Sequence, residues 1–134
     1  MAKLTSIEGI TDAAIGKLAK AQVGSTTTLL ARAATAAGRS ELAKASGVTE
    51  KRLLEWVNRA DLVRIVGVGK EYSDLLEASG VDTVPELAKR KPANLLEAMT
   101  VVNTKKKLVR QLPTEAKVAG WVAQAKKLPK LVKH

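Results

Sequence analysis

Alanine and leucine dominate the apolar positions of this chain, and alternating apolar–polar runs of β-branched residues are missing. In one stretch, Ser73 and Leu76 fall on one helical face with Leu75 beside it. Phenylalanine is absent, and the aromatic residues are Trp56, Trp121 and Tyr72. The pattern predicts an all-α protein, a compact bundle of about nine or ten short helices. We place these helices near residues 12–22, 26–37, 40–46, 50–60, 61–66, 70–79, 84–90, 92–100, 104–111 and 115–127.

Several predicted helices have recognisable end signals. Thr83-Val84-Pro85-Glu86 offers a capping threonine, a proline in the first turn and a glutamate three residues after the cap. Thr49 and Thr114 are placed to cap the helices that follow them. Asn103 or Thr104 is expected to cap a lysine-rich helix. Four glycines stand where preceding helices should end: Gly24, Gly38, Gly47 and Gly80.

Part of the pattern repeats after 58 residues, so that Ile7 corresponds to Ile65 and Gly9 to Gly67. Further along, Glu55-Trp56-Val57 resembles Gly120-Trp121-Val122 at a shift of 65. We interpret the chain as two copies of one helical unit, 1–60 and 61–134, forming one compact body. A tryptophan is expected to anchor the core of each copy. The other pairs at the shorter shift are Ile10–Val68, Leu18–Leu76, Val23–Val81, Ser25–Thr83 and Leu29–Leu87.

The most informative stretch is Ile65–Leu76. We call its first part, residues 65–70, the second hairpin. Gly67 and Gly69 bracket Val68, and two glycines in three residues predict a tight turn that opens into a helix. The first amides of such a helix lack intrahelical partners and favour an anion, most often phosphate. Lys70 would add a charge, whereas Glu71 and Asp74 would oppose a phosphate. A phosphate contact and a purely structural hairpin both remain open.

Val66, Gly67, Val68, Gly69 and Ser73 resemble the helix-hairpin-helix motif: apolar, Gly, apolar, Gly, then a small residue four positions on. The spacing resembles tandem helix-hairpin-helix units over nearly the whole chain. More narrowly, it resembles a small uncharacterised family of such domains found mainly in bacteria. The resemblance implies that amides around Val68, Gly69 and Lys70 hold a DNA backbone phosphate without reading sequence. It supplies no enzymatic activity. The runs that carry the narrower resemblance are Ile7-Glu8-Gly9-Ile10, Glu55–Leu62 and Lys107–Pro113.

The first hairpin, residues 7–12, is a weaker candidate for phosphate binding at Gly9, Ile10 and Thr11. Thr11 replaces the second glycine of the motif and is more typical of a helix cap. Asp12 beside it would repel an incoming phosphate.

The net charge of +10 is uneven. Residues 99–134 contain eight lysines and one arginine against one glutamate, 9 − 1 = +8, which leaves +2 for residues 1–98. A basic end on a nearly balanced body suggests an anionic partner, and the alternative is a solubilising charged face. Few aromatic residues favour duplex DNA over single strands. The cations expected to contact phosphate are Lys105, Lys106, Lys107, Arg110, Lys126 and Lys127.

A second DNA-binding pattern lies in Glu41–Val57, where Ala43, Gly47, Leu53 and Trp56 fit the spacing of a helix-turn-helix. Its second helix would offer a major groove the side chains of Lys51, Arg52 and Asn58. Glu50 and Glu55 on that helix oppose groove binding, and ordinary packing of a helical hairpin explains the same spacing.

The composition excludes other classes of function. There is no cysteine, and the one histidine, His134, is terminal, so thiolate chemistry, zinc sites and histidine-based triads are not expected. We expect a non-enzymatic protein with no cofactor, no metal and no small-molecule substrate. No signal peptide or membrane span is recognisable, which predicts a cytoplasmic protein, nucleoid-associated if it binds DNA. The alternative function is a protein-interaction module that docks on an acidic protein surface.

Overall fold

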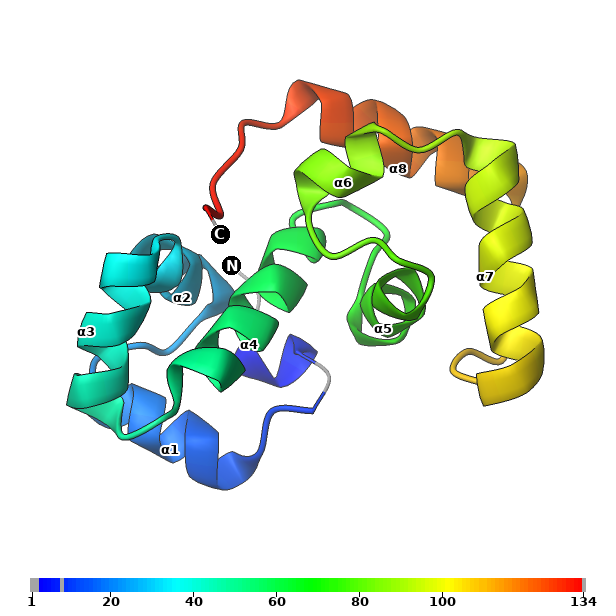
Figure 1. Cartoon of the computed structure of the whole chain (residues 1–134). Coiled ribbons are helices and arrows are strands. Elements are labelled where there is room, and N and C mark those ends of the chain that lie inside the picture. The colour runs from blue at the N-terminus through cyan, green and yellow to red at the C-terminus, as the bar shows by residue number, and fades with distance from the viewer. Residues whose placement is uncertain (1–2, 8, 134) are drawn as a thin grey trace. The chain divides into compact units, whose positions relative to one another are not determined.

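A computed structural model describes residues 3–7 and 9–133 of the chain. The regular elements of this part are helical, as Figure 1 shows, and the predicted all-α fold is confirmed. There are slightly fewer helices than predicted. They are a short 3-10 helix η1 (Leu4–Ser6) and the α-helices α1 (Asp12–Lys20), α2 (Thr26–Ala33), α3 (Ala36–Ser46), α4 (Glu50–Leu62), α5 (Lys70–Ala78), α6 (Val84–Ala88), α7 (Pro92–Lys106) and α8 (Glu115–Lys127).

The chain divides into two compact units, each with its own apolar core. Unit 1 is Met1–Asp61 with Leu131–His134, and unit 2 is Leu62–Lys130. Trp56 lies in the core of unit 1 and is 4% exposed, and Trp121 lies in the core of unit 2 and is 3% exposed. The prediction that a tryptophan anchors each core is therefore confirmed.

Threonine and serine caps set the helix starts of unit 1. The side chain of Thr11 accepts a hydrogen bond from the amide of Ala14, and Ser25 and Thr35 do the same at the starts of α2 and α3. Thr49 Oγ1 accepts from the amide of Arg52 at 3.3 Å, so the predicted cap of α4 is confirmed. These side chains satisfy amides that otherwise have no partner within the helix.

Two of the predicted glycine stops are wrong. Gly38 lies in the first turn of α3, where a Cβ would clash with the carbonyl oxygen of Arg32, so close approach of the chain explains this glycine. Gly24 lies beyond the end of α1, and the left-handed residue there is Gln22, with φ 67°. Gly47, with φ 79°, closes α3 as predicted.

The residues just before the C-terminus pack on unit 1. Val132 is buried in its core, and the amide of Lys133 donates to the carbonyl of Ala34 at 2.7 Å. The guanidinium of Arg39, which is 5% exposed, donates to the carbonyls of Ala33, Ala34 and Lys133 at 2.9, 3.2 and 3.0 Å. One buried arginine thus fastens this segment to the junction between α2 and α3.

In unit 2, helices α6 and α7 pack on α8, and α5 packs on α7. The predicted separate helix over 61–66 is wrong, because α4 continues to Leu62 and a turn follows. Thr83 begins α6 with a proline in the first turn, although its side chain makes no capping bond. Thr114 Oγ1 accepts from the amide of Lys117 at 3.2 Å, which confirms the cap of α8.

The predicted lysine-rich helix over 104–111 is also wrong. Helix α7 runs without a break to Lys106, and Lys107 ends it in the left-handed region with φ 50°. Thr100 and Thr104 donate their hydroxyls to carbonyls four residues earlier, so neither interrupts the helix. Asn103 caps no helix. Its amide group bonds both the amide and the carbonyl of Val109, at 3.0 and 3.2 Å, and so fixes the following loop.

No helix in the part of the chain that the structure describes has the length and apolar character needed to cross a membrane.

Candidate nucleic-acid interface

The second hairpin forms an exposed bend in front of α5. Gly67 has φ +98°, a conformation that favours glycine, and the amide of Val68 donates to the carbonyl of Ile65 at 3.1 Å. The side chains of Ile65 and Val68 are buried in the core of unit 2, while Gly67, Gly69 and Lys70 are exposed. Val66 is 80% exposed. The bend is therefore anchored by two apolar side chains and open to solvent at its tip.

Helix α8 contacts this bend and holds it in place. The side chain of Gln124 accepts from the amide of Val66 at 2.9 Å and donates to its carbonyl at 3.1 Å. A Cβ on Gly67 would lie 3.0 Å from Trp121 Nε1, so any other residue here would displace the indole slightly and would also need a positive φ. Nothing in the sequence predicts a role for Gln124, because it lies 58 residues from the hairpin.

The start of α5 has no side-chain cap. Gly69 is the N-cap residue, with extended backbone geometry, and nothing fills the space where its Cβ would be. The first backbone bond of the helix runs from the amide of Ser73 to the carbonyl of Gly69 at 2.9 Å. The expectation that the Val68 amide faces a phosphate needs correction, because the turn uses that amide internally. The proposed phosphate contact therefore rests on the amides that follow Val68.

The described residues of the first hairpin also include a glycine with positive φ, but the helix that follows is capped differently. Gly9 has φ +84°, and the amide of Ile10 donates to the carbonyl of Ile7 at 3.4 Å. Thr11 Oγ1 accepts from the amide of Ala14 at 3.1 Å, as its reading as a helix cap predicts. The Thr11 side chain therefore caps the N-terminal turn of α1, whereas no side chain caps the matching turn of α5.

The predicted cations are all exposed, but the contacts connect only some of them with the second hairpin. Lys126 and Lys127 lie in the last turn of α8, next along that helix from Gln124. Arg110 precedes Gln111, whose carbonyl accepts from the Tyr72 hydroxyl at 3.1 Å in the first helical turns of α5. Arg64, which the sequence analysis missed, donates to the carbonyl of Pro129 at 2.9 Å.

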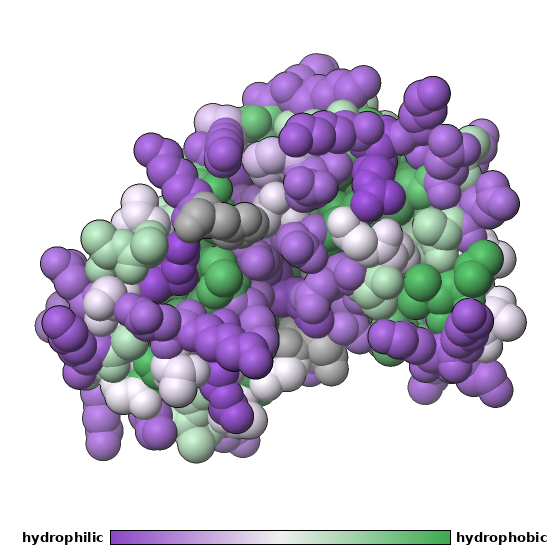
Figure 2. Space-filling view, in the orientation of Figure 1, coloured by the Kyte–Doolittle hydropathy of each residue, from purple (hydrophilic) through white to green (hydrophobic). Residues whose placement is uncertain are grey.

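The remaining predicted cations, Lys105, Lys106 and Lys107, lie at the end of α7. Among the described residues, no hydrogen bond joins them to the second hairpin. In the view of Figure 2, hydrophilic side chains gather over the region where Figure 1 places α8. The contacts therefore join the bend to α8, which carries Lys126 and Lys127, and join α5 to the loop that carries Arg110.

Two carboxylates accompany the bend. Glu71 is exposed in the first turn of α5, and Asp74 is half-buried one turn further on. Within the described residues, no group of three or more histidine, cysteine, aspartate or glutamate side chains is placed to hold a metal ion.

A family model described as a domain of unknown function (DUF4332) matches residues 8–128. The chain belongs to this family. The predicted resemblance to an uncharacterised domain family is confirmed to that extent. No curated protein and no solved structure matches the chain. The DUF4332 match covers the second hairpin and every predicted cation, but it brings no assigned chemistry, so function must be argued from the residues.

The two hydrogen bonds between the Gln124 side chain and the Val66 backbone are expected to hold the second hairpin of this DUF4332 domain rigid. In Gln124→Ala, the Val66 peptide loses both side-chain bonds, each worth about 1 kcal/mol at most in a partly exposed place. Amide hydrogen exchange at Val66 and Val68 is expected to be about tenfold faster, while the helix content by circular dichroism stays unchanged. Gln124→Glu keeps the acceptor and loses the donor, so it should give an intermediate rate. Unchanged exchange at Val66 in both variants would show that these bonds do not hold the bend.

Proposed function

We propose that this protein binds duplex DNA without enzymatic activity and without strong sequence preference. Backbone phosphates would meet the amides at Gly69 and the first turn of α5, with Lys70 beside them. The observation that carries the proposal is an exposed two-glycine bend in front of a helix start that has no side-chain cap. Such a terminus favours an anion through its amides and its dipole.

We further propose that the two hairpins belong to tandem helix-hairpin-helix units. Corresponding glycines, Gly9 and Gly67, both have positive φ. The bond from the Val23 amide to the Leu18 carbonyl, at 2.8 Å, has its counterpart 58 residues on, from Val81 to Leu76 at 2.9 Å. Helices α1 and α5 begin and end at the same shift. Two copies of one unit account for these correspondences.

The charge distribution supports a duplex as the partner. Lys126 and Lys127 belong to α8, which contacts the hairpin, and Arg110 lies beside Gln111, which contacts α5. These three cations would neutralise neighbouring phosphates. Trp56 and Trp121 are buried in the cores, so neither offers a face on which bases of a single strand could stack. A cytoplasmic, nucleoid-associated location follows from this proposal.

Titration with a short duplex in low and moderate salt tests DNA binding directly. If about four phosphates are neutralised, the association constant should fall about 100-fold between 50 and 200 mM salt. Two duplexes of unrelated sequence should bind within a few-fold of each other. Failure to bind at low salt, or binding that ignores salt, would refute the proposal. A strong preference for one duplex would instead favour the helix-turn-helix in α3 and α4.

The variant Gly69→Asp tests the contact itself. The side chain fits, because the space around Gly69 is open, and an aspartate at this position caps a helix well. The fold should therefore be kept or stabilised, while the carboxylate repels phosphate and duplex affinity falls about tenfold, or about 1.4 kcal/mol. Gly69→Asn is the matched control, since it caps the helix without the charge and should lose less. Equal affinity of wild type and Gly69→Asp would exclude the hairpin from the interface.

A second candidate function is protein interaction without DNA. Glu71 beside the bend and the 80% exposed side chain of Val66 at its tip favour this reading. The basic residues would then dock on an acidic protein surface. A partner retained from nuclease-treated lysate, together with no duplex binding at low salt, would favour it.

A further inference from the structure

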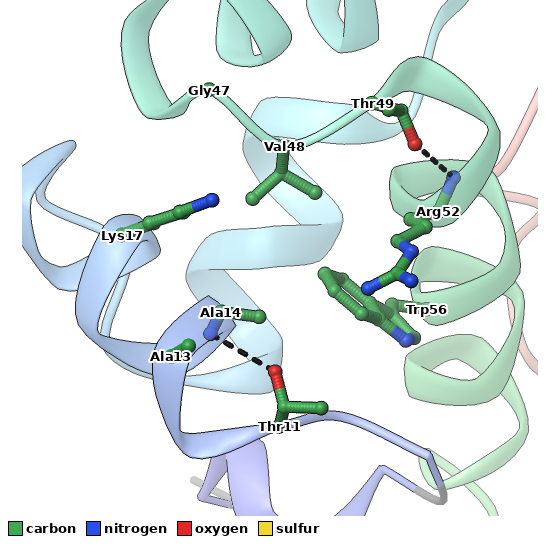
Figure 3. Close-up of a pocket in the computed structure, with 9 residues that line it drawn as sticks. All are labelled: Thr11, Ala13, Ala14, Lys17, Gly47, Val48, Thr49, Arg52 and Trp56. Carbon is green, nitrogen blue, oxygen red and sulfur yellow. Dashed lines mark hydrogen bonds between the residues drawn. The ribbon is translucent and has the colours of Figure 1, made fainter.

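Unit 1 contains a cavity of about 280 Å³. Its lining residues are distant in sequence from the second hairpin. It lies between the first two turns of α1, the turn that joins α3 to α4, and the start of α4. The lining residues that matter here are Thr11, Lys17, Val48, Thr49, Arg52 and Trp56 (Figure 3). Figure 3 shows the Lys17 ammonium directed toward Val48 and the Arg52 guanidinium beside the indole of Trp56.

This cavity has a strongly positive lining. Lys17 and Arg52 come from different helices, and among the described residues neither side chain has a hydrogen-bond or ion-pair partner. None of the described lining residues is acidic. Asp12 and Glu50, which begin α1 and α4, do not belong to the lining. An anion that binds in a cavity lined by two cationic side chains, with no acidic residue among the described lining residues, is stabilised by both of them.

The ends of two helices add to this charge. Thr11 and Thr49 precede α1 and α4, and each accepts a bond from an amide of its own helix. The cavity therefore lies beside the N-terminal, partly positive ends of both helices, although each threonine already caps one amide and Asp12 and Glu50 add negative charge outside the lining. The threonine hydroxyls are also able to donate to a bound oxygen.

We propose that this cavity binds the phosphate group of a small phosphorylated molecule. Arginine offers a planar set of donors that matches phosphate oxygens, and lysine adds a compact charge. The volume is at the lower end of the range for small-molecule sites, so it suits a phosphate with a short organic part. Trp56 supplies an apolar wall. The orientation of Arg52 into this cavity also gives that residue a role other than reading a DNA groove.

Nuclear magnetic resonance on the 15N-labelled full chain tests this proposal, with inorganic phosphate and glycerol 3-phosphate as probes and sodium chloride at matched ionic strength as the reference. Saturable shifts are expected at the amides of Ala13, Val48 and Thr49 and at the Trp56 indole, with the Trp121 indole unmoved. Lys17→Gln and Arg52→Gln should each weaken binding about tenfold. Both side chains are exposed, so these variants are expected to fold.

Lys20→Gln is the matched control, since Lys20 is an exposed lysine of α1 outside the lining. Shifts that do not exceed those in chloride, or equal weakening in Lys20→Gln and Lys17→Gln, would overturn the proposal. Shifts at these groups with duplex DNA alone would overturn it as well, and would assign the cavity to the DNA interface. Gly69→Asp should leave phosphate binding here unchanged, which separates this site from the proposed hairpin contact.

Discussion

Replacing Trp121 by alanine is expected to lower the free energy of unfolding of unit 2 by about 3–5 kcal/mol, the cost of removing a large aromatic side chain from a packed core. The indole is 3% exposed and stacks at a tilt on Tyr72, with ring centroids 5.2 Å apart. It also lies against the bend at Gly67. The substitution therefore removes core packing and the surface on which the second hairpin lies.

Urea unfolding followed by circular dichroism measures this loss. Trp121→Phe is the matched control, because it keeps the aromatic contact with Tyr72 and removes less volume, so it should cost less than half as much. Amide exchange at Val68 should accelerate strongly in the alanine variant. A loss below about 1 kcal/mol would mean that unit 2 can close the cavity by itself and that Trp121 is not its anchor.

Much of this fold can be predicted because its signals are local. Threonine before a helix satisfies amides within the next three residues, so Thr49 and Thr114 were recognisable as caps. A glycine pair such as Gly67 and Gly69 marks a bend because the backbone itself requires it. The burial of both tryptophans follows from their size and rarity in a chain so poor in aromatic residues.

The errors arise where distant contacts decide the outcome. Asn103 is a good cap by composition, yet in the fold it bonds Val109 and shapes a loop. Gly38 looked like a helix end, but its role is to let the carbonyl of Arg32 approach. No spacing rule in the sequence joins Gln124 to Val66, since that contact depends on how α8 packs in unit 2.

In the candidate sites, too, local features can be predicted from the sequence, and features that depend on distant contacts cannot. The glycines and Lys70 of the second hairpin are exposed, while the use of the Val68 amide inside the turn is not visible in the sequence. Lys17 was not singled out, because its neighbours in the cavity come from α4 and from the turn before it. The sequence predicts for Arg52 only a role in reading a DNA groove. Gly9 and Gly67 both have positive φ, but the caps of α1 and α5 differ. We therefore predict that a capping residue fits at position 69. We also predict that the charge of this residue decides whether phosphate binds.

Replacing Arg39 by methionine is expected to lower the free energy of unfolding of unit 1 by about 3 kcal/mol, because one buried and two partly buried carbonyls lose charge-assisted donors. Methionine keeps roughly the length of the side chain, so the loss reports the bonds to Ala33, Ala34 and Lys133 more than a cavity. Urea unfolding gives the energy, and amide exchange at Lys133 shows whether the segment detaches from Ala34.

Arg39→Lys is the control for charge alone. It keeps the cation but cannot present two nitrogens in a fixed plane to separate carbonyls, so it should recover only part of the stability. If both variants unfold like the wild type, the segment around Val132 is held by its apolar contact and the arginine contributes little. If Arg39→Met accelerates exchange at Lys133 without changing the global transition, the fastening is local. The Arg39 bonds then stabilise only the segment that follows α8. They do not stabilise the core that contains Leu18, Leu29 and Trp56.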